Sequence, residues 1–573
     1  MIGTIQAVFG NMVVAESDET IVQNSVGYCC RADGAKLLSE VIRVRGKKID
    51  LQVFEETRGL KVGDEVEFDT NMLSVKLGPG LIGQIYDGLQ NPLPQLADKI
   101  GYFLEAGNYL PGLDLERKWD FTPTAAVGDT VSAGDCLGTV PETMFTHKIM
   151  APFNLSGKYT IASIIAAGSY TVAEQIATLT NEAGDEVAVT MQQDWPVKRP
   201  LAVCKKRLLP TEPLCTRVRI VDSMFPIVKG GTYCIPGPFG AGKTVLQHVT
   251  SRNAEVDIVI IAACGERAGE VVETIREFPE LIDPRTGRTL MERTIIIANT
   301  SAMPVAAREA SVYTGVTLAE YYRQMGLNVL MLADSTSRWA QAMRELSGRL
   351  EEIPGEEAFP AYLESRIASF YERAGCLELN DGTTASVTIG GTVSPAGGNF
   401  EEPVTQGTLK VVGAFHGLSY ARSYARRYPA IDPLESWSKY PGIIDPAKVE
   451  AVRSVLRRGN EVKQMMTVVG EEGTPLEDFL TMLKAELFDN CYLQQYAFDD
   501  IDGNSSPERQ TFVFDKILSV LELDIQCDDK ASGRDIVLKL QDELRTWNYT
   551  EFESDKYTAQ LAKIDALIAP HSS

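Results

Sequence analysis

The sequence predicts a multidomain α/β protein. Its parts are an N-terminal β-barrel, a β-rich inserted bulge domain, a central α/β domain on a parallel sheet, and a C-terminal helical bundle. Short alternating segments separated by turn residues fill the first third of the chain, and apolar strands then alternate with helical patterns up to about residue 440. The remainder carries only helical periodicity. At 573 residues the chain is also too long for a single hydrophobic core.

Turn residues and changes in periodicity divide the chain into five segments. We expect the β-barrel at 1–72, a linker into the core at 73–109, the bulge domain at 110–198, the α/β domain at 199–440 and the helical domain at 441–573. The barrel assignment depends on the period of two at 48–54 and the turn chemistry at 59–64. A hairpin-dense run at 127–138 indicates the second β-rich segment.

The C-terminal segment carries one start signal and several apolar stripes. Thr474-Pro475-Leu476-Glu477 fits a capping box with proline at the first helical position, so we expect a helix to begin there. Stripes of Leu, Ile and Val at helical spacing predict further helices over 508–525 and 533–567. We interpret these stripes as packing between helices.

The composition excludes several classes of protein. The net charge is −23 and the isoelectric point about 4.8, which disfavours a nucleic-acid partner because binding to a phosphate backbone needs a basic surface. The ten cysteines form no C-x-x-C pair and the four histidines have no metal-ligand spacing, so we expect a reducing compartment and no zinc site. The chain shows no signal-peptide pattern and no apolar run near the roughly 18 residues that span a bilayer, so we expect membrane association only through partner subunits.

The most specific motif lies at 237–244 and fits G-x-x-x-x-G-K-[ST], the phosphate-binding P-loop. Lys243 supplies a mobile positive charge for the β- and γ-phosphates, and the Thr244 hydroxyl is the usual Mg²⁺ ligand. A β-prone run precedes the loop and a helical run follows it, so the helix N-terminus faces the phosphates. We expect nucleotide contacts from Gly237, Pro238, Phe239, Gly240, Ala241, Gly242, Lys243, Thr244 and Val245.

Two apolar strands after the P-loop each deliver a carboxylate. The run at 256–263 leads to Glu266 and Arg267, and the run at 328–333 ends in Asp334. A carboxylate just past a buried strand is placed to polarise water, and an Asp at a strand end is placed on the Mg²⁺ side of the nucleotide. Two simpler interpretations stay open. Glu266 and Arg267 could be a solvated pair at a helix start, and Asp334 could cap the helix that follows it.

On these motifs the chain resembles the catalytic A subunits of the V/A-type rotary ATPases, over essentially its full length. The insertion at 110–195 distinguishes that family from the β subunits of F-type enzymes. The motifs that carry the resemblance are 77–81 with 86–90, 236–244, 264–267, 298–301, 303–309, 334–339 and 402–406.

The resemblance implies a RecA-like P-loop nucleotide-binding domain at 199–440 and assigns roles at matching positions. Lys243 binds phosphate, Glu266 orients the water that attacks the γ-phosphate, and Arg267 steadies that loop. Thr244 and, through a water, Asp334 serve the Mg²⁺ that accompanies ATP or ADP. The adenine is expected between Tyr428 and Phe498, although either ring could be an ordinary core aromatic.

The chain also departs from the family pattern at two places. Residues 268–271 read Ala-Gly-Glu-Val where the family usually has Gly-Asn-Glu-Met, and 432–437 replace a common Asn-Trp stretch. These changes leave the expected catalytic acid and loop intact, but they put in doubt the fine geometry around the γ-phosphate and the adenine. Ala241 stands where eukaryotic forms carry a cysteine, so we expect no redox control there.

The implied function is Mg²⁺-dependent ATP hydrolysis or synthesis, coupled through rotation to proton or sodium transport. The family places this subunit peripherally on the cytoplasmic face of a membrane. It alternates with a non-catalytic B subunit in a three-plus-three ring, and the B subunit supplies an arginine in trans. Central rotor shaft and peripheral stalk subunits are further partners. Three alternatives stay open: a non-catalytic ring subunit, an RNA-translocating hexameric helicase such as Rho, and a protein-export ATPase.

Overall fold

The computed structural model describes residues 1–101 and 106–571. Residues 102–105 of the predicted linker and 572–573 of the predicted helical domain lie outside the described residues. The chain forms two compact units. Unit 1 comprises Met1–Leu209, Val256–Val393 and Glu401–Thr408, and unit 2 comprises Pro210–Glu255, Ser394–Phe400 and Leu409–Ser573.

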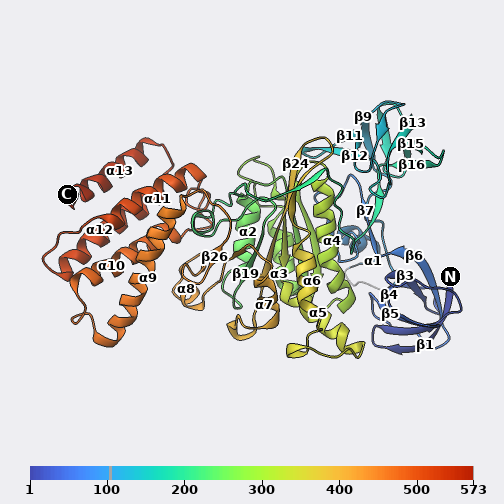
Figure 1. The fold of residues 1–573 in the computed structure, drawn as a ribbon, viewed down its shortest axis with the longest axis horizontal. Coiled ribbons are helices and arrows are strands. Elements are labelled where there is room, and N and C mark those ends of the chain that lie inside the picture. Colours follow the sequence, from blue (N-terminus) through green and yellow to red (C-terminus); the bar gives the residue numbers. More distant parts are fainter. Residues whose placement is uncertain (102–105, 572–573) are drawn as a thin grey trace. The chain divides into compact units, whose positions relative to one another are not determined.

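A closed antiparallel barrel begins unit 1, in the strand order β1-β2-β5-β4-β3-β6 (Figure 1, blue). Its strands are β1 (Ile2–Phe9), β2 (Met12–Glu16), β3 (Ser25–Cys30), β4 (Lys36–Arg45), β5 (Lys48–Val53) and β6 (Glu65–Met72). Alternate residues face inward, as in β1, where Gly3 and Ile5 are buried between exposed neighbours. Closure leaves this sheet without an open edge.

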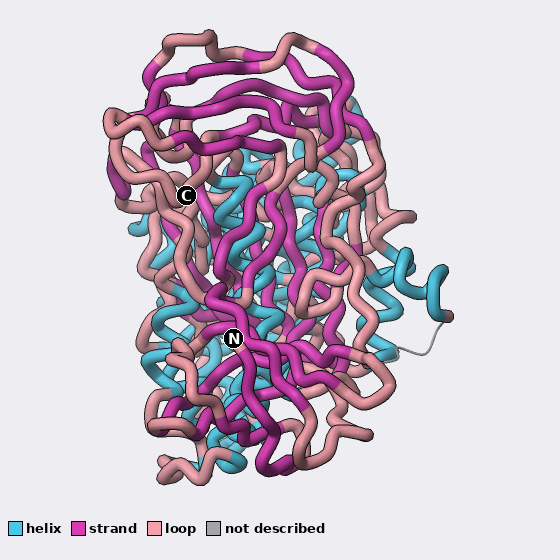
Figure 2. The backbone as a smooth tube through the Cα atoms, turned by 90° about the vertical axis from the view of Figure 1, so that its right-hand side faces the viewer, coloured by secondary structure: helices cyan, strands magenta, loops and turns pink. Residues whose placement is uncertain are grey.

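The inserted segment forms two four-stranded antiparallel sheets, whose strands are among those drawn in magenta in Figure 2. One sheet has the order β10 (Thr130–Val131), β13 (Tyr159–Ile164), β15 (Gln175–Asn181), β16 (Glu186–Thr190). The other has the order β12 (Phe145–Met150), β11 (Cys136–Glu142), β9 (Lys118–Pro123), β14 (Gly168–Thr171). After them, β17 (Gln193–Pro196) pairs with β7 (Ser74–Leu77), so the insertion returns to the segment from which it departs.

The α/β part of unit 1 contains a parallel sheet. Its order is β24 (Thr384–Val393), β22 (Asn328–Asp334), β20 (Ile258–Glu266), β21 (Thr294–Thr300), β8 (Ile85–Tyr86). Antiparallel β23 (Gly375–Glu378) and β18 (Lys206–Leu208) extend it beside β24. Every residue of β20 is buried, as expected for a parallel strand covered on both faces.

Helices alternate with these strands along the chain. They are α1 (Leu93–Ile100), α3 (Ala268–Glu277), α4 (Val305–Arg323), α5 (Thr336–Arg349), α6 (Leu363–Tyr371) and α7 (Pro403–Leu409). Helix α4 packs on β20 and β22 and is buried around nearly its whole circumference. Gly315 permits this close approach, because a Cβ there would lie 3.0 Å from Met331 Cε and 3.2 Å from Ala262 Cβ.

Unit 2 contains the strand that leads into the P-loop. β19 (Thr232–Pro236) pairs in parallel with β25 (Ala414–Phe415), which pairs antiparallel with β26 (Trp437–Ser438). Helix α2 (Lys243–Asn253) follows the loop, and α8 (Tyr420–Tyr424) follows β25. A short helical turn at Ile220–Met224 precedes β19.

The C-terminal part of unit 2 is a helical bundle (Figure 1, orange to red). Its helices are α9 (Pro446–Val469), α10 (Leu476–Phe488), α11 (Pro507–Glu522), α12 (Lys530–Asn548) and α13 (Asp555–Ile568). The stretch 533–567, predicted as helical, therefore holds parts of two helices, and the chain turns between Asn548 and Asp555.

The predicted capping box at Thr474 is wrong. Helix α10 has Pro475 at its N-cap position and no side-chain cap hydrogen bond, because the Thr474 hydroxyl donates to the Gly470 carbonyl at 3.1 Å, at the end of α9. A true capping box lies at the start of α12. There Asp529 accepts from the Ser532 N–H at 2.8 Å, and the Asp529 N–H donates to the Ser532 hydroxyl at 3.2 Å.

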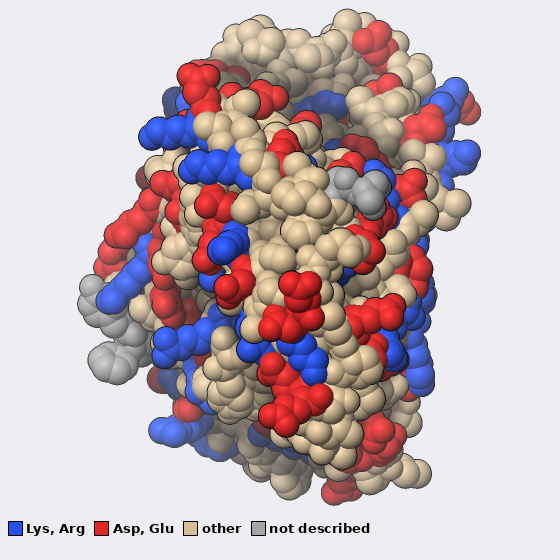
Figure 3. Space-filling view, turned by 90° about the vertical axis from the view of Figure 1, so that its left-hand side faces the viewer, with Lys and Arg blue, Asp and Glu red and all other residues tan. Residues whose placement is uncertain are grey.

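The structure confirms the predicted fold class: a barrel, a β-rich insertion, an α/β region with parallel strands and a helical C-terminus. The exact segment bounds stay a prediction. All ten cysteines are free. Within 1–101 and 106–571, no helix has the length and apolarity needed to cross a membrane. On the face drawn in Figure 3, acidic and basic side chains are intermixed rather than gathered into a basic stripe.

Candidate nucleotide site

The P-loop connects β19 to α2, and its backbone conformation depends on glycine. Gly240 and Gly242 have φ values of +78° and +93°, a region that residues with a Cβ rarely adopt. Gly237 is needed for a different reason, because a Cβ there would lie 2.6 Å from Leu418 Cβ. The spacing of glycines in the motif therefore reflects two backbone turns and one close contact.

Lys243 and Thr244 are the first two residues of α2, where backbone N–H groups have no partner inside the helix. The Lys243 ammonium donates to the carbonyls of Gly237 at 2.8 Å and Pro238 at 2.9 Å, so it lies over the loop. This arrangement combines a mobile cation with the positive end of a helix dipole, which suits a polyphosphate anion. Of the remaining predicted contacts, Phe239 and Val245 are exposed and Ala241 is buried.

A mostly apolar cavity of about 280 Å³ lies beside the loop, entirely within unit 2. Gly240, Ala241, Gly242 and Val245 line it from the P-loop and α2, while Tyr428 and Phe498 line it from two distant segments. Tyr428 is 44 % exposed and Phe498 is 72 % exposed, so neither ring is an ordinary core aromatic. An apolar slot with accessible aromatic faces beside a P-loop has the chemistry required to stack a nucleotide base.

The cavity also has lining residues that the sequence analysis missed. Val218, Leu418, Gln495 and Tyr496 contribute to its walls. Tyr496 is 55 % exposed, and its ring centroid lies 6.0 Å from that of Phe498. No motif marks these positions. The only sequence signal was the pair of aromatic residues flanking Ala497, of which the analysis selected one.

In unit 1, Glu266 and Asp334 end neighbouring parallel strands at the same edge of the sheet. Ala263 of β20 pairs with Asp334 of β22, so Glu266 lies three residues further along its strand. Glu266 and Asp334 are each only 8 % exposed. The sequence analysis expected Glu266 beyond the strand, whereas the structure makes it the last residue of β20.

The turn at Glu266 places cationic side chains close by. Gly265 has φ of +100°, and a Cβ there would lie 2.8 Å from Arg308 Cδ and 3.5 Å from Arg338 Cβ. Arg308 is 8 % exposed and reaches Glu345 at 3.4 Å. Arg267 is exposed and precedes α3 as its N-cap residue. The structure thus brings Arg308, which the sequence analysis gave no role, to the backbone beside the predicted catalytic acid.

Ser335, and not Asp334, is the N-cap residue of α5, and Asp334 Oδ1 accepts a hydrogen bond from the Thr392 hydroxyl at 2.5 Å. That bond comes from β24, the strand next to β22, and it orients the carboxylate. Among residues 1–101 and 106–571, no group of three or more His, Cys, Asp and Glu side chains could hold a metal. This donor set fits Mg²⁺ carried by a nucleotide, which takes one or two protein oxygens besides phosphates and water.

Burial also controls the ionisation of His416 and Cys234 in unit 2 and of Cys264 in unit 1. His416 follows β25, is 1 % exposed, and its Nε2 donates to the Phe225 carbonyl at 2.9 Å. Desolvation lowers the pKa of His416 to about 4, although that hydrogen bond opposes the shift. Burial raises the pKa of the Cys234 and Cys264 thiols, which therefore behave as small apolar side chains.

Four protein-family models match successive parts of this chain. Residues 2–69 match the β-barrel domain of the ATP synthase alpha/beta family, and 110–198 match the barrel-sandwich domain of the ATP synthase alpha/beta subunit. Residues 217–438 match the nucleotide-binding domain of the ATP synthase alpha/beta family. Residues 447–524 match the C-terminal domain of V and A type ATP synthase.

Individual relatives match over almost the whole chain. A V-type ATP synthase alpha chain of Treponema denticola is 62 % identical over 97 % of this chain and 94 % of its own length. Those of Borrelia hermsii and Borrelia turicatae are each 60 % identical over 97 % of this chain and 96 % of their own length.

Proposed function

Since the chain belongs to the family of V-type ATP synthase alpha chains, we propose that its P-loop and the apolar cavity beside it, here called the base cavity, bind the nucleotide that is hydrolysed or synthesised, and that Glu266 and Asp334 supply the acidic groups of the reaction. The chain is the catalytic subunit of a rotary ATPase. This membership decides against the helicase, the export ATPase and the non-catalytic ring subunit. The observation that carries the site assignment is the apolar cavity directly beside the P-loop, with Tyr428 and Phe498 in its walls.

The roles that we propose for the individual residues follow the chemistry of phosphoryl transfer, in which positioning and charge neutralisation dominate. Lys243 and the N-terminus of α2 neutralise the phosphates, and the two exposed rings hold the base. Glu266 accepts a hydrogen bond from the attacking water and polarises it, and Arg267 steadies the turn that follows. Mg²⁺, when bound with the nucleotide, neutralises phosphate charge; the Thr244 hydroxyl and, through a water, Asp334 are the residues proposed to hold it.

The chain acts within an assembly. We propose that a non-catalytic B subunit alternates with it in a three-plus-three ring and supplies an arginine to the γ-phosphate in trans, as the family resemblance implies. Rotor and stalk subunits couple turnover to proton or sodium transport, and the chain reaches the cytoplasmic face of a membrane only through them. An isolated chain should then bind nucleotide but turn over slowly, and adding the B subunit should raise kcat by about 10³-fold or more.

The decisive test of the site is Glu266→Gln in the reconstituted assembly. We expect kcat for ATP hydrolysis to fall by about 10³-fold, because the amide cannot serve as a general base, while the Kd for MgADP stays within about twofold. Glu273→Gln is the matched control, since Glu273 is exposed on α3 close to the same turn. An assembly with Glu266→Gln that hydrolyses ATP at the normal rate removes Glu266 from the mechanism.

A further inference from the structure

A buried arginine lies behind the wall of the base cavity, in the segment that precedes β19. Arg219 is 1 % exposed, yet its guanidinium has an acceptor for each of its nitrogens. Its Nε donates to the Tyr492 carbonyl at 2.9 Å, its Nη2 to the Gln494 carbonyl at 2.5 Å, and its Nη1 to Asp502 Oδ1. All of these acceptors belong to the segment 492–502, which carries Tyr496 and Phe498.

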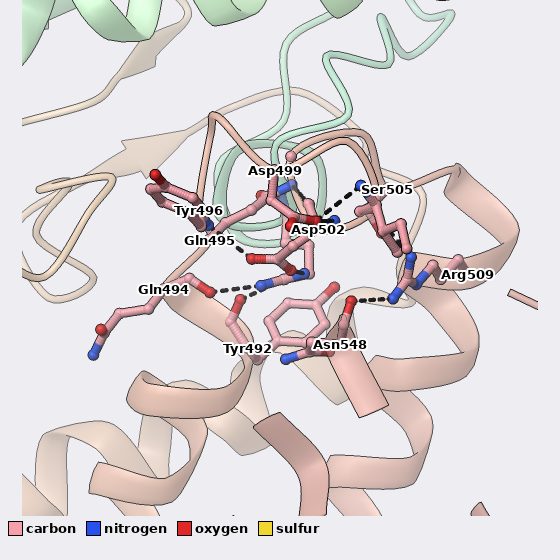
Figure 4. Close-up of polar contacts among 12 residues, drawn as sticks. Tyr492, Gln494, Gln495, Tyr496, Asp499, Asp502, Ser505, Arg509 and Asn548 are labelled. Carbon is pink, nitrogen blue, oxygen red and sulfur yellow. Dashed lines mark hydrogen bonds and ion pairs between the residues drawn. The ribbon is translucent and has the colours of Figure 1, made fainter. Parts of the chain in front are cut away.

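Asp502 connects this arginine to the cavity wall itself. It is 2 % exposed, and its second oxygen, Oδ2, accepts from the Tyr496 N–H at 2.7 Å. The Gln495 side-chain amide donates to the Asp502 carbonyl at 2.7 Å, and its oxygen accepts from the Arg219 N–H at 2.8 Å. Figure 4 shows Asp502 near the centre of this network, with Gln495 and Tyr496 on one side of it.

The same network fixes the spacing between the two walls. The Gln495 N–H donates to the Tyr428 carbonyl at 2.9 Å, which joins the Phe498 wall to the Tyr428 wall. At the far end of the segment, the Asn253 side chain at the end of α2 donates to the Gly503 carbonyl at 2.9 Å. The wall is therefore attached to Arg219, to the Tyr428 segment and to α2.

The exposed rings cannot establish this geometry themselves. Tyr496, Phe498 and Tyr428 are each at least 44 % exposed, so little packing holds their side chains. The position of each ring is instead determined by the position of its own backbone. Asp502 is a buried attachment of the 495–498 backbone, and the cation that Asp502 pairs with is Arg219.

We propose that Arg219 and Asp502 are positioning residues of the base cavity: their buried ion pair holds the 492–502 segment so that a nucleotide base fits between Tyr428 and Phe498. This inference rests on the proposed function, because it assigns the cavity to the base of the nucleotide. The pair touches no phosphate-binding residue among its described contacts, so it contributes to base affinity and not to phosphate affinity. A planar guanidinium with three donor nitrogens is needed for this role, and a lysine at 219 retains the charge but cannot reach three acceptors from one rigid plane.

The test compares a ligand with a base and a ligand without one, on the full-length chain. Calorimetric titration measures the Kd of MgADP and of magnesium pyrophosphate for the wild type, Arg219→Lys and Asp502→Asn. We expect both variants to raise the Kd of MgADP by about tenfold, the effect of losing one base–aromatic stack, and to leave the Kd of magnesium pyrophosphate within about twofold. In the assembly the same variants should raise KM for ATP more than they lower kcat.

A matched control and a rescue separate positioning from general stability. Arg293→Lys alters another fully buried arginine–aspartate pair, in which Arg293 Nε lies 2.8 Å from Asp283 Oδ2, and neither residue lines the cavity. It should lower the melting temperature without changing the Kd of MgADP. The double variant Arg219→Gln with Asp502→Asn removes both charges, and it should bind MgADP more tightly than Arg219→Gln alone, because the latter leaves a buried carboxylate unpaired.

The outcomes separate this inference from the proposed function. A wild-type chain that binds neither ligand overturns the nucleotide site itself. A wild type that binds both, together with variants that weaken both ligands equally or weaken neither, overturns only the positioning role of Arg219 and Asp502.

Discussion

The P-loop and the base cavity adjoin one another in unit 2, but they are built in different ways. The loop is one run of eight residues, and its geometry follows from two glycines with positive φ and from the start of α2. The cavity draws its walls from segments near residues 218, 240–249, 418–430 and 495–503. Phosphate binding therefore depends on local backbone conformation, whereas base binding depends on tertiary contacts such as those of Arg219.

The two regions also differ in where their functional groups lie. Lys243 rests against the carbonyls of its own loop, while Tyr428 and Phe498 stand exposed on separate segments. We expect damage to the phosphate side to abolish turnover and damage to the base side to weaken affinity. The predictions below test that contrast.

Lys243→Ala should have the largest effect. It removes the charge that neutralises the β- and γ-phosphates, so we expect kcat/KM for ATP to fall by at least about 10²–10³-fold in the assembly. Steady-state hydrolysis measures this. Lys205→Ala is the control, because Lys205 is an exposed lysine paired with Glu378. A Lys243→Ala assembly that retains half of the wild-type rate contradicts the P-loop assignment.

Asp334→Asn should act on the metal requirement. The carboxylate is oriented by Thr392, and we expect its loss to raise the Mg²⁺ concentration for half-maximal hydrolysis by about 10–100-fold. A magnesium titration at fixed ATP measures the shift. Asp381→Asn, on the exposed turn where Asp381 pairs with Lys148, should leave it unchanged. Equal magnesium curves for Asp334→Asn and wild type would place Asp334 outside the metal site.

Tyr428→Ala and Phe498→Ala should act on affinity. Each substitution removes one of the two aromatic rings proposed to stack on the base in the base cavity. We therefore expect KM for ATP to rise by about tenfold while kcat stays within about threefold. Tyr424→Ala provides the control, because Tyr424 is 82 % exposed and does not line the cavity. If KM is unchanged in both cavity variants, the base binds elsewhere and the contrast between the two regions fails.

The smallest effect concerns His416, which contacts the strand leading to the loop through its N–H to the Cys234 carbonyl, at 2.9 Å. Its pKa in the fold is about 4, against 6.5 for an ordinary histidine. The fold holds it neutral, so stability is full above pH 6.5 and declines as pH falls toward 4, when the unfolded chain binds a proton first. The loss should be about 0.8 kcal/mol at pH 6.

The pH dependence of the melting temperature checks this prediction. His416→Gln keeps an amide donor for Phe225 but has no titration in this range. The melting temperature of this variant should therefore fall less than that of the wild type between pH 7 and pH 5.5. Parallel curves for the two proteins would show that His416 does not titrate as its burial implies.

Several features could be predicted because they depend on neighbours in sequence. The apolar run at 328–333 predicted β22 with Asp334 at its end, and the glycine spacing predicted the turns before α2. Predictions failed where a distant or unexpected partner intervened. Thr474 bonds backward to Gly470 instead of capping α10.

The sequence by itself determined the fold class and the phosphate-binding loop, because each depends on periodicity or on consecutive residues whose backbone preferences are local. The family was indicated by the resemblance of motifs along the whole chain. Only the tertiary structure decided how the base cavity is assembled. Arg219 and Asp502 lie 283 residues apart, and their pairing arises from the packing of the 492–502 segment onto the turn before β19. The partner of a buried charge is determined by tertiary packing, and no local sequence pattern specifies it.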